Sequence, residues 1–486
     1  NSVTGATRNL TVDGSGNTTI NGTITTTSGT LTKIGSGTLT LSGANTYSGV
    51  TNINAGTLVA ANNTALGGTG AGAGTTVAAG ATLALQGGIT VGDEPLILGG
   101  SGVGGNGALR NIGGNNTLGG SLALASDTEI QSDAGTLTLA GLIGGAGSDL
   151  TFDGAGNTTH STFIANLGSL TKNGTGTLTL SALNISTGPT TITNGTLQAN
   201  GGNAIGDSSA VTVGGSGVLA LGANETIGSL AGAGAVNLGA NTLTAGGDNT
   251  STTFSGVASG TGGLTKAGTG TLTLSGANTY SGVTNVDAGT LAVTANNALG
   301  TNAAGTSVAS GATLDLQNVN YSTTEAVTLN GGTLATSTGT SSLAGAVSLT
   351  APSSINVSGT QLTLSGAVSA PTALAVAATG NLTAVNAAND FSSVSISGAN
   401  NVQINDINDL TLGASTIGGA LTATAGGAIT LSGNLTASGA GDAITLSGAR
   451  FDNSAAAALS TPNGRWLVWS SNPSPFSGAT PDVRGG

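Results

Sequence analysis

Short runs of the chain alternate a hydroxyl side chain with an apolar one, as in Thr38-Leu39-Thr40-Leu41. An alternation with a period of two places the leucines on one face of an extended strand and the threonines on the other. The segments between the runs, such as Ser-Gly-Ala-Asn, are typical of turns, because Gly and Asn tolerate a positive φ. No stretch has a period of 3.6 residues, and Gly recurs too often for a helix to propagate. The pattern therefore predicts short strands joined by turns.

The alternating pattern also repeats over long distances. Residues 28–67 and 262–300 are nearly identical, and residues 168–206 form a diverged third copy. Within every copy a strand returns to the same phase 19 residues later, from Thr38 to Thr57, from Thr177 to Thr196 and from Thr271 to Thr290. Repetition at this scale is typical of an array in which each copy is one stacked unit.

A strand that regains its phase after about twenty residues predicts one coil of a parallel β-helix, in which coils stack about 4.8 Å apart. We therefore expect an all-β, right-handed parallel β-helix (β-solenoid) of roughly 20–25 coils. Leu, Val and Ile should stand in columns inside, and Thr, Ser and Asn in columns outside. An array of Ig-like sandwiches is less favoured, because such domains bury an aromatic residue in units of about 100 residues. The copies here begin at uneven distances, at Lys33, Lys172 and Lys266, and contain no Trp.

The chain has three predicted regions. Residues 1–345 hold the clear copies and the coils that link them, residues 346–460 keep the alternation in a degenerate form, and residues 461–486 form a distinct tail. The tail contains both tryptophans and four of the eight prolines, Pro462, Pro473, Pro475 and Pro481. One hypothesis is a cap that folds back over the last coil and protects its exposed strand edge. The other is a docking segment whose contact residues are Trp466, Leu467, Val468 and Trp469.

Composition narrows the class of protein. Of 486 residues, 87 are Gly, 6% are charged and none is Cys or Met; the net charge is −12. This charge argues against nucleic acid as a partner, which requires a basic surface. No run of about 18 apolar residues is present, so we expect no transmembrane segment. Residue 1 is Asn and no signal segment opens the chain, which indicates a processed or excised piece.

Residues that could carry chemistry are few, and we expect no catalytic, metal or cofactor site. His160 is the only histidine, and it is expected at the surface. Asp13, Asp153 and Asp248 begin similar lead-in segments that precede the three copies, and they are interpreted as turn residues rather than calcium ligands. The two carboxylates of the acidic stretch 405–409 are expected to lie on a turn and to be simply solvated. The polysaccharide-cleaving β-helices need several carboxylates near Arg or Lys. The three lysines occupy equivalent positions in separate copies, and the arginines are scattered.

Two tyrosines and the threonine columns have alternative interpretations. Tyr47 and Tyr280 occupy the same position in two copies, where packing over a turn is favoured over sugar binding. The Thr-x-Thr columns could order ice, but any solvated β-helix face needs the same pattern.

The phrase GTGTLTLSGANTYSGVTNVDAGTL (residues 268–291) resembles the autotransporter-associated β-strand repeat of large bacterial exoproteins. The lead-ins at 13–33 and 153–172 are similar, and residues 389–433 and 464–476 resemble the stem of filamentous-haemagglutinin-like exoproteins. This resemblance implies a parallel β-helix, an extracellular or bacterial cell-surface location, and adhesive or structural roles. Neither a membrane-barrel translocator nor an N-terminal secretion domain is evident in the sequence.

Together these observations predict a non-catalytic rod, stalk or matrix module of a bacterial exoprotein. Its expected partners are host or matrix glycans or proteins. The alternative is a filament subunit that associates end to end through the solenoid ends and the tail. An enzyme is the third and least favoured class.

Overall fold

The computed structural model describes residues 2–69 and 73–472. Over these residues the chain is all-β, with parallel strands stacked as a β-solenoid of about 22 turns and one short 3-10 helix, η1 (Val103–Gly105). The predicted fold class is therefore confirmed. Contacts divide the chain into two compact units, residues 1–248 and 249–486.

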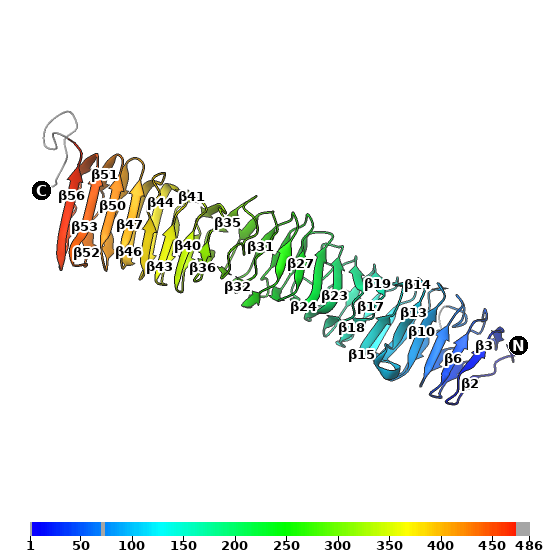
Figure 1. Ribbon diagram of the computed structural model, residues 1–486. Coiled ribbons are helices and arrows are strands. Elements are labelled where there is room, and N and C mark those ends of the chain that lie inside the picture. Colours follow the sequence, from blue (N-terminus) through cyan, green and yellow to red (C-terminus); the bar gives the residue numbers. More distant parts are fainter. Residues whose placement is uncertain (1, 70–72, 473–486) are drawn as a thin grey trace. The chain divides into compact units, whose positions relative to one another are not determined.

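The first unit is built from short strands in chain order (Figure 1). They are β1 (Val3–Thr4), β2 (Leu10–Val12), β3 (Thr18–Ile20), β4 (Ile24–Thr25), β5 (Leu31–Lys33), β6 (Thr38–Leu41), β7 (Thr51–Ile53), β8 (Thr57–Ala60), β9 (Thr75–Val77), β10 (Thr82–Gln86), β11 (Thr90–Val91), β12 (Leu96–Gly100), β13 (Leu109–Gly113), β14 (Asn116–Leu118), β15 (Leu122–Ser132), β16 (Thr136–Leu139), β17 (Ile143–Gly144), β18 (Leu150–Asp153), β19 (Asn157–His160), β20 (Ile164–Ala165), β21 (Leu170–Lys172), β22 (Thr177–Leu180), β23 (Thr190–Ala199), β24 (Ala210–Leu221), β25 (Glu225–Ile227), β26 (Ser229–Gly232), β27 (Ala235–Asn237) and β28 (Leu243–Ala245).

The second unit continues in the same way. They are β29 (Thr252–Phe254), β30 (Val257–Ser259), β31 (Leu264–Lys266), β32 (Thr271–Leu274), β33 (Thr284–Val286), β34 (Thr290–Val293), β35 (Thr306–Ala309), β36 (Thr313–Leu316), β37 (Asn320–Tyr321), β38 (Val327–Asn330), β39 (Thr333–Thr336), β40 (Thr340–Leu343), β41 (Val347–Ala351), β42 (Ser353–Val357), β43 (Gln361–Leu364), β44 (Val368–Ala378), β45 (Asn381–Ala384), β46 (Asp390–Ala399), β47 (Val402–Asp406), β48 (Leu410–Leu412), β49 (Ser415–Ile417), β50 (Leu421–Ala425), β51 (Ala428–Leu431), β52 (Leu435–Ala437), β53 (Gly441–Gly448), β54 (Arg450–Asp452), β55 (Leu459–Ser460) and β56 (Gly464–Ser470).

The 19-residue spacing seen in the sequence is one complete coil. β6 pairs in parallel with β8, so that Thr38 lies beside Thr57 and Leu39 beside Leu58. The corresponding strands β32 and β34 pair in the same register. Because equal residues stack directly on one another, each repeated phrase forms a column that runs through successive coils.

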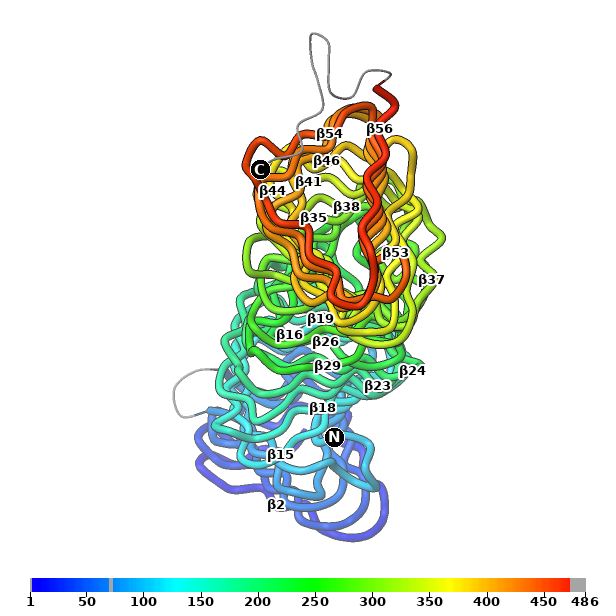
Figure 2. The backbone as a smooth tube through the Cα atoms, turned by 90° about the vertical axis from the view of Figure 1, so that its left-hand side faces the viewer, coloured from blue at the N-terminus to red at the C-terminus, as the bar shows by residue number. Residues whose placement is uncertain are grey.

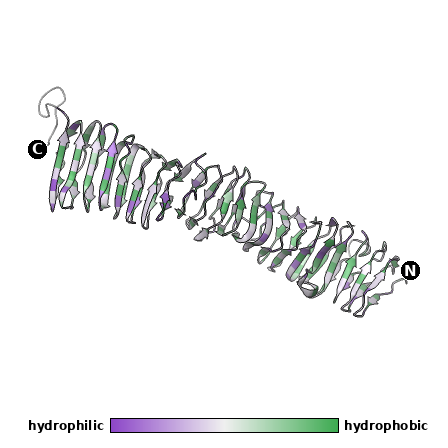
Figure 3. Cartoon of the chain, in the orientation of Figure 1, coloured by the Kyte–Doolittle hydropathy of each residue, from purple (hydrophilic) through white to green (hydrophobic). Residues whose placement is uncertain are grey.

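The core of each unit consists of the apolar columns. Leu39, Leu41 and Leu58 are fully buried, and Thr38 and Thr40 between them are half-exposed, as the alternation predicts. Figure 2 shows that each turn of the backbone surrounds a narrow interior, and Figure 3 shows apolar and polar positions alternating along the strands. The hydroxyl residues do not all lie outside, however: Thr51, Thr75 and other members of short turn-flanking strands are buried. The interior therefore contains polar columns that the simple inside–outside rule missed.

His160 corrects another expectation, because it lies in the core rather than at the surface. It is 1% exposed and stacks between Leu139 and Leu180 of the neighbouring coils. Its Nδ1 lies 3.1 Å from the carbonyl oxygen of Leu139, and burial lowers the pKa of the ring. The side chain therefore acts as a mainly neutral core residue.

Candidate functional site

The most specific features of the structure are clusters of buried polar side chains that recur in the three copies. An asparagine at the same position in each copy bridges three coils. The Oδ1 atom of Asn45 accepts a hydrogen bond from the Ile24 amide at 2.8 Å, and its Nδ2 donates to the Ala65 carbonyl at 2.6 Å. Asn184 and Asn278 make the same pair of contacts with the coils below and above them. These asparagines satisfy backbone groups where the coil bends and no strand pairing does so.

The tyrosines of the first and third copies are also interior residues. Tyr47 and Tyr280 are fully buried, and each hydroxyl lies within 2.7 Å of a threonine hydroxyl, Thr51 or Thr284. Each ring packs against the glycine that turns the next coil, Gly67 or Gly300. The expected packing over a turn is therefore observed, and neither ring can stack on a sugar in this conformation.

A buried glutamate lies near each tyrosine cluster, two coils further along the chain. Glu94 and Glu325 are each 1% exposed, and each accepts a hydrogen bond from a buried threonine, Thr75 at 2.8 Å and Thr306 at 2.9 Å. Their second carboxyl oxygens, the Oε2 atoms, have no partner in the described part of the chain. Burial raises the pKa of both carboxyls to about 7, against the opposing effect of the threonine hydrogen bond. Sequence reasoning did not single out these residues.

The three lysines are buried as well, at positions set by the strand alternation. In Leu31-Thr32-Lys33 the lysine follows Leu31 by two residues and therefore shares its inward face. The Nζ atom of Lys33 donates to the carbonyls of Gly35 and Ala55, and Lys172 makes the equivalent bonds in the second copy. Burial lowers the pKa of Lys172 to about 8. The lysines thus bind the turn carbonyls of two coils and do not converge on one another.

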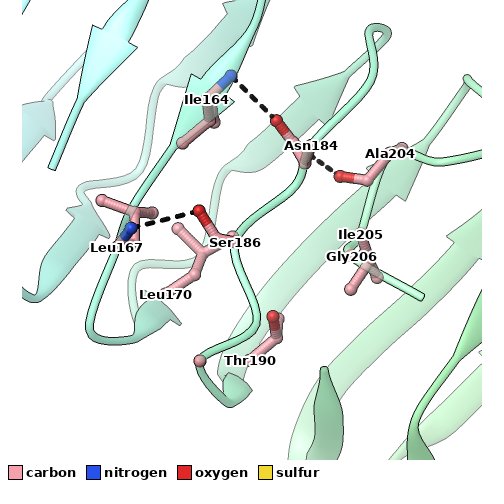
Figure 4. A pocket seen from close by; sticks show the side chains of 10 residues that line it. Ile164, Leu167, Leu170, Asn184, Ser186, Thr190, Ala204, Ile205 and Gly206 are labelled. Carbon is pink, nitrogen blue, oxygen red and sulfur yellow. Dashed lines mark hydrogen bonds between the residues drawn. The ribbon is translucent and has the colours of Figure 1, made fainter. Parts of the chain in front are cut away.

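The second copy differs from the other two and contains a cavity (Figure 4). Ser186 stands where Tyr47 and Tyr280 stand, and it lines a cavity of about 20 Å³ together with Ile164, Leu170, Thr190 and Ile205. Leu167 also lines this cavity and is buried, whereas the corresponding loop residues of the other copies, Ser28 and Thr261, are exposed. Leu167 therefore turns inward and supplies part of the missing aromatic volume.

The acidic stretch 405–409 is not fully solvated, because Asp406 lies on β47 and is 5% exposed. The predicted turn role of Asp13 and Asp153 agrees with the geometry. A carboxyl oxygen of Asp13 accepts from the amide of Gly14, and one of Asp153 accepts from the amide of Gly154, both at 2.6 Å. Within the described ranges, no three His, Cys, Asp or Glu side chains gather in a way that could hold a metal ion.

The predicted contact residues of the tail lie on a strand and face two directions. β56 pairs in parallel with β53, and Trp466 and Val468 lie beside the buried residues Ile444 and Leu446, on the core side. Leu467 and Trp469 alternate with them and lie on the outer face. Trp466 is 51% and Trp469 61% exposed. Pro473, Pro475 and Pro481 lie outside the described residues.

Comparison with family models identifies the repeats. Residues 31–60, 170–199 and 264–293 match the passenger-associated-transport-repeat, and residues 399–460 match repeats of unknown function. Each of the three matches begins and ends with a strand of the coil pair described above, from β5 to β8, from β21 to β23 and from β31 to β34. Comparisons with curated proteins and with solved structures gave no match.

The predicted resemblance to the autotransporter-associated repeat is thereby confirmed, and the repeats and fold together are those of a passenger-type β-helical domain. Among the described residues, no helix is long and apolar enough to span a bilayer.

Proposed function

We propose that this chain is a non-catalytic structural and adhesive rod, stalk or matrix module of a bacterial surface or secreted exoprotein. The observation that carries the proposal is the arrangement of its polar groups. The buried lysines, glutamates and asparagines are equivalent positions of separate coils, and each binds the backbone or a hydroxyl of its own neighbourhood. Such groups stabilise coils, whereas a catalytic site needs several of them converging on one cleft.

An extracellular location agrees with the passenger-type repeats and with the absence of cysteine. The stacked coils present a long series of solvated columns, which suits contact with extended surfaces more than with one small molecule. The three copies of the repeat therefore support the proposal of a mechanical role.

A direct test is to coat beads with the purified chain and measure their attachment to host cells and to extracellular matrix, with bare beads as the control. Reducing-sugar release from a polysaccharide panel is measured on the same preparation. We expect attachment without turnover. Attachment no greater than that of bare beads would contradict the adhesive role, and turnover above the rate of a heat-denatured sample would contradict the non-catalytic one.

A second candidate function, a filament subunit, is favoured by the position of Trp466. Among the described strands, β56 has a partner on one side only, and Trp466 and Val468 lie on its core side. Edge strands with apolar neighbours promote pairing with another chain. Electron micrographs of the purified chain separate the two: discrete particles favour the stalk, and continuous fibres that disappear on deletion of residues 461–486 favour the filament.

A further inference from the structure

One outer face of the second unit is polar and uncharged over five neighbouring strands. It belongs to the eight-stranded sheet of the second unit, whose order is β37-β40-β43-β45-β47-β50-β53-β56. Residues of β40, β43, β45, β47 and β50 that alternate with the buried ones are Thr, Ser, Asn and Gln, and the one ionisable side chain of these strands, Asp406, is buried.

Two neighbouring columns on this face end on β56, the first at Leu467 and the second at Trp469. In the first, Gln403 lies beside Thr422 and Thr422 beside Thr445. In the second, Asn405 lies beside Thr424, which is followed by Ser447 and then Trp469. The polar patch is defined as the hydrophilic residues of these two columns together with Trp469, which are Gln403, Asn405, Thr422, Thr424, Thr445, Ser447 and Trp469. Coils about 4.8 Å apart and residues about 7 Å apart along each strand give it a regular grid of groups.

The side chains of this patch form no hydrogen bonds with one another. Elsewhere on the same sheet, side chains are paired: Asn401, just before β47, donates to Asn381 of β45 at 3.0 Å, and Gln361 donates to Thr363 of β43 at 3.0 Å. Asn405 of the patch donates to the carbonyl oxygen of Val385 at 2.9 Å. Within the described chain, the side chains of Gln403, Thr422 and Thr424 have no hydrogen-bond partner and are exposed. The amide and hydroxyl groups therefore offer both donors and acceptors to a ligand.

We propose that the polar patch binds a neutral polysaccharide, an inference that rests on the adhesive function proposed above and names its ligand class. Sugar hydroxyls are donors and acceptors at once, which matches amide and hydroxyl side chains. Trp469, 61% exposed at the end of the second column, supplies the apolar ring surface against which a sugar ring can pack.

The charge of the chain favours a neutral polysaccharide over an acidic one. The chain carries −12 overall, and Arg465, the cation nearest to the patch on β56, is paired with Asp442 at 2.5 Å. On the described strands of this sheet, no unpaired cation offsets the like charge that an acidic polysaccharide would meet. A protein partner fits less well, because the centres of protein interfaces are rich in apolar, aromatic and Arg side chains rather than Thr, Asn and Gln.

The test is affinity electrophoresis of the full chain in gels that contain dextran or galactomannan, with alginate and heparin as acidic probes. Two variants remove patch groups, T422A/T424A and W469A, and T416A removes an exposed threonine of β49 as the matched control. We expect retardation by at least one neutral polymer that persists at high salt, since no ion pairs are involved. The dissociation constant should rise about tenfold in both patch variants and stay unchanged in T416A.

Circular dichroism and the thermal midpoint confirm that each variant is folded. The proposal is overturned if no neutral polymer retards the wild-type chain, if heparin or alginate retards it equally, or if T416A weakens binding as much as T422A/T424A. Bead attachment that survives in a chain that binds no neutral polymer would leave the adhesive function standing with a protein partner. Loss of attachment together with retained glycan binding would contradict the adhesive function alone.

Discussion

At the scale of single residues, the second copy shows how a solenoid compensates for a lost aromatic ring. Ser186 replaces the tyrosine, Leu167 turns inward, and a cavity of about 20 Å³ remains between them. A space of this size is near that of one water molecule, and Ser186, Thr190 and Asn184 offer it polar partners. In the second copy, the buried ring of a tyrosine is therefore replaced by the inward side chain of Leu167 and a small cavity.

Restoring the tyrosine alone should fail. We expect Ser186→Tyr to lower the free energy of unfolding by about 1–3 kcal/mol, because Leu167 already fills part of the ring's volume. Combining it with Leu167→Ser, the residue present at Ser28 of the first copy, should recover most of the loss through the Tyr–Thr190 hydrogen bond. Urea unfolding of both single variants and the double variant measures the coupling. Additive effects would contradict the shared-volume account.

The buried glutamates predict a pH dependence of stability. The folded-state pKa values of Glu94 and Glu325, about 7, lie above the ordinary value near 4.5. Between these values the folded chain retains protons that the unfolded chain has released, so the stabilising contribution is complete below pH 4.5. It is lost as the pH rises to 7. The free energy of unfolding should therefore fall by up to about 1.4 kcal/mol per pH unit for each carboxyl, and level off above pH 7.

Urea unfolding at pH 5 and pH 7.5 measures this slope. The groups facing the carboxyls are Tyr47 and Thr75 around Glu94, and Tyr280, Tyr321 and Thr306 around Glu325. The double variant E94Q/E325Q should lose most of the slope, while Glu225, with a pKa also near 7, keeps its share. D93N, a change at the exposed neighbour of Glu94, is the control and should leave the slope intact. An equal slope in both variants would show that other groups control the titration.

At the scale of elements, the turn between strands matters as much as the strands. Gly289 ends the turn before β34 with a φ of 64°, and a Cβ there would lie 2.5 Å from the carbonyl oxygens of Gly268 and Gly270 in the coil below. Gly56 and Gly195 have the same conformation in the other copies. The glycine is thus required both by its positive φ and by the close stacking of turns.

The contributions of the positive φ and of the close stacking of turns can be separated by experiment. Gly289→Ala should cost several kcal/mol, because it adds a clash with backbone to the strain of a left-handed residue. Gly311→Ala is the matched control: its φ is 78°, but its Cβ would meet open space. We expect it to cost only about 1–2 kcal/mol, the strain alone. Thermal unfolding of the two variants measures the difference, and equal losses would argue that turn stacking contributes nothing.

The strands and their register were predictable from sequence, and the polar interior was only partly so. The 19-residue spacing from Thr38 to Thr57 correctly predicted the length of one coil, because identical residues stack on one another in adjacent strands. His160 was misplaced although the corresponding residues of the other lead-ins, Ile20 and Phe254, are apolar, a comparison that would have assigned it to the core. Glu94 and Glu325 carry no such signal, because they lie in turns, where alternation does not define an inner face. The strand in the tail was missed because Trp466 and Trp469 were read as one contact surface. On a strand, residues three positions apart point to opposite faces, so these two side chains lie on different faces.

At the scale of the whole molecule, stacking predicts that entire coils can be removed but parts of coils cannot. Deleting residues 38–56 joins Gly37 to Thr57, so that Leu58 takes the place of Leu39 above Thr18. Thr75 likewise takes the place of Thr51 above Leu31, so the strand columns keep their inward and outward residues. The contacts of Asn45 and Tyr47 are lost with the deleted coil. Because each coil contacts mainly its neighbours, we expect a folded chain with unchanged strand content per residue and modestly reduced stability.

The contrasting variant deletes residues 38–47, about half of that coil. The strands that follow then meet the wrong partners, and apolar side chains are carried to positions where the coil below presents turns or polar residues. We expect loss of cooperative unfolding and exposure of apolar surface, measured by dye binding and circular dichroism. If both deletions fold equally well, the coil is not the unit of stability, and independent local structure rather than stacking holds the columns together.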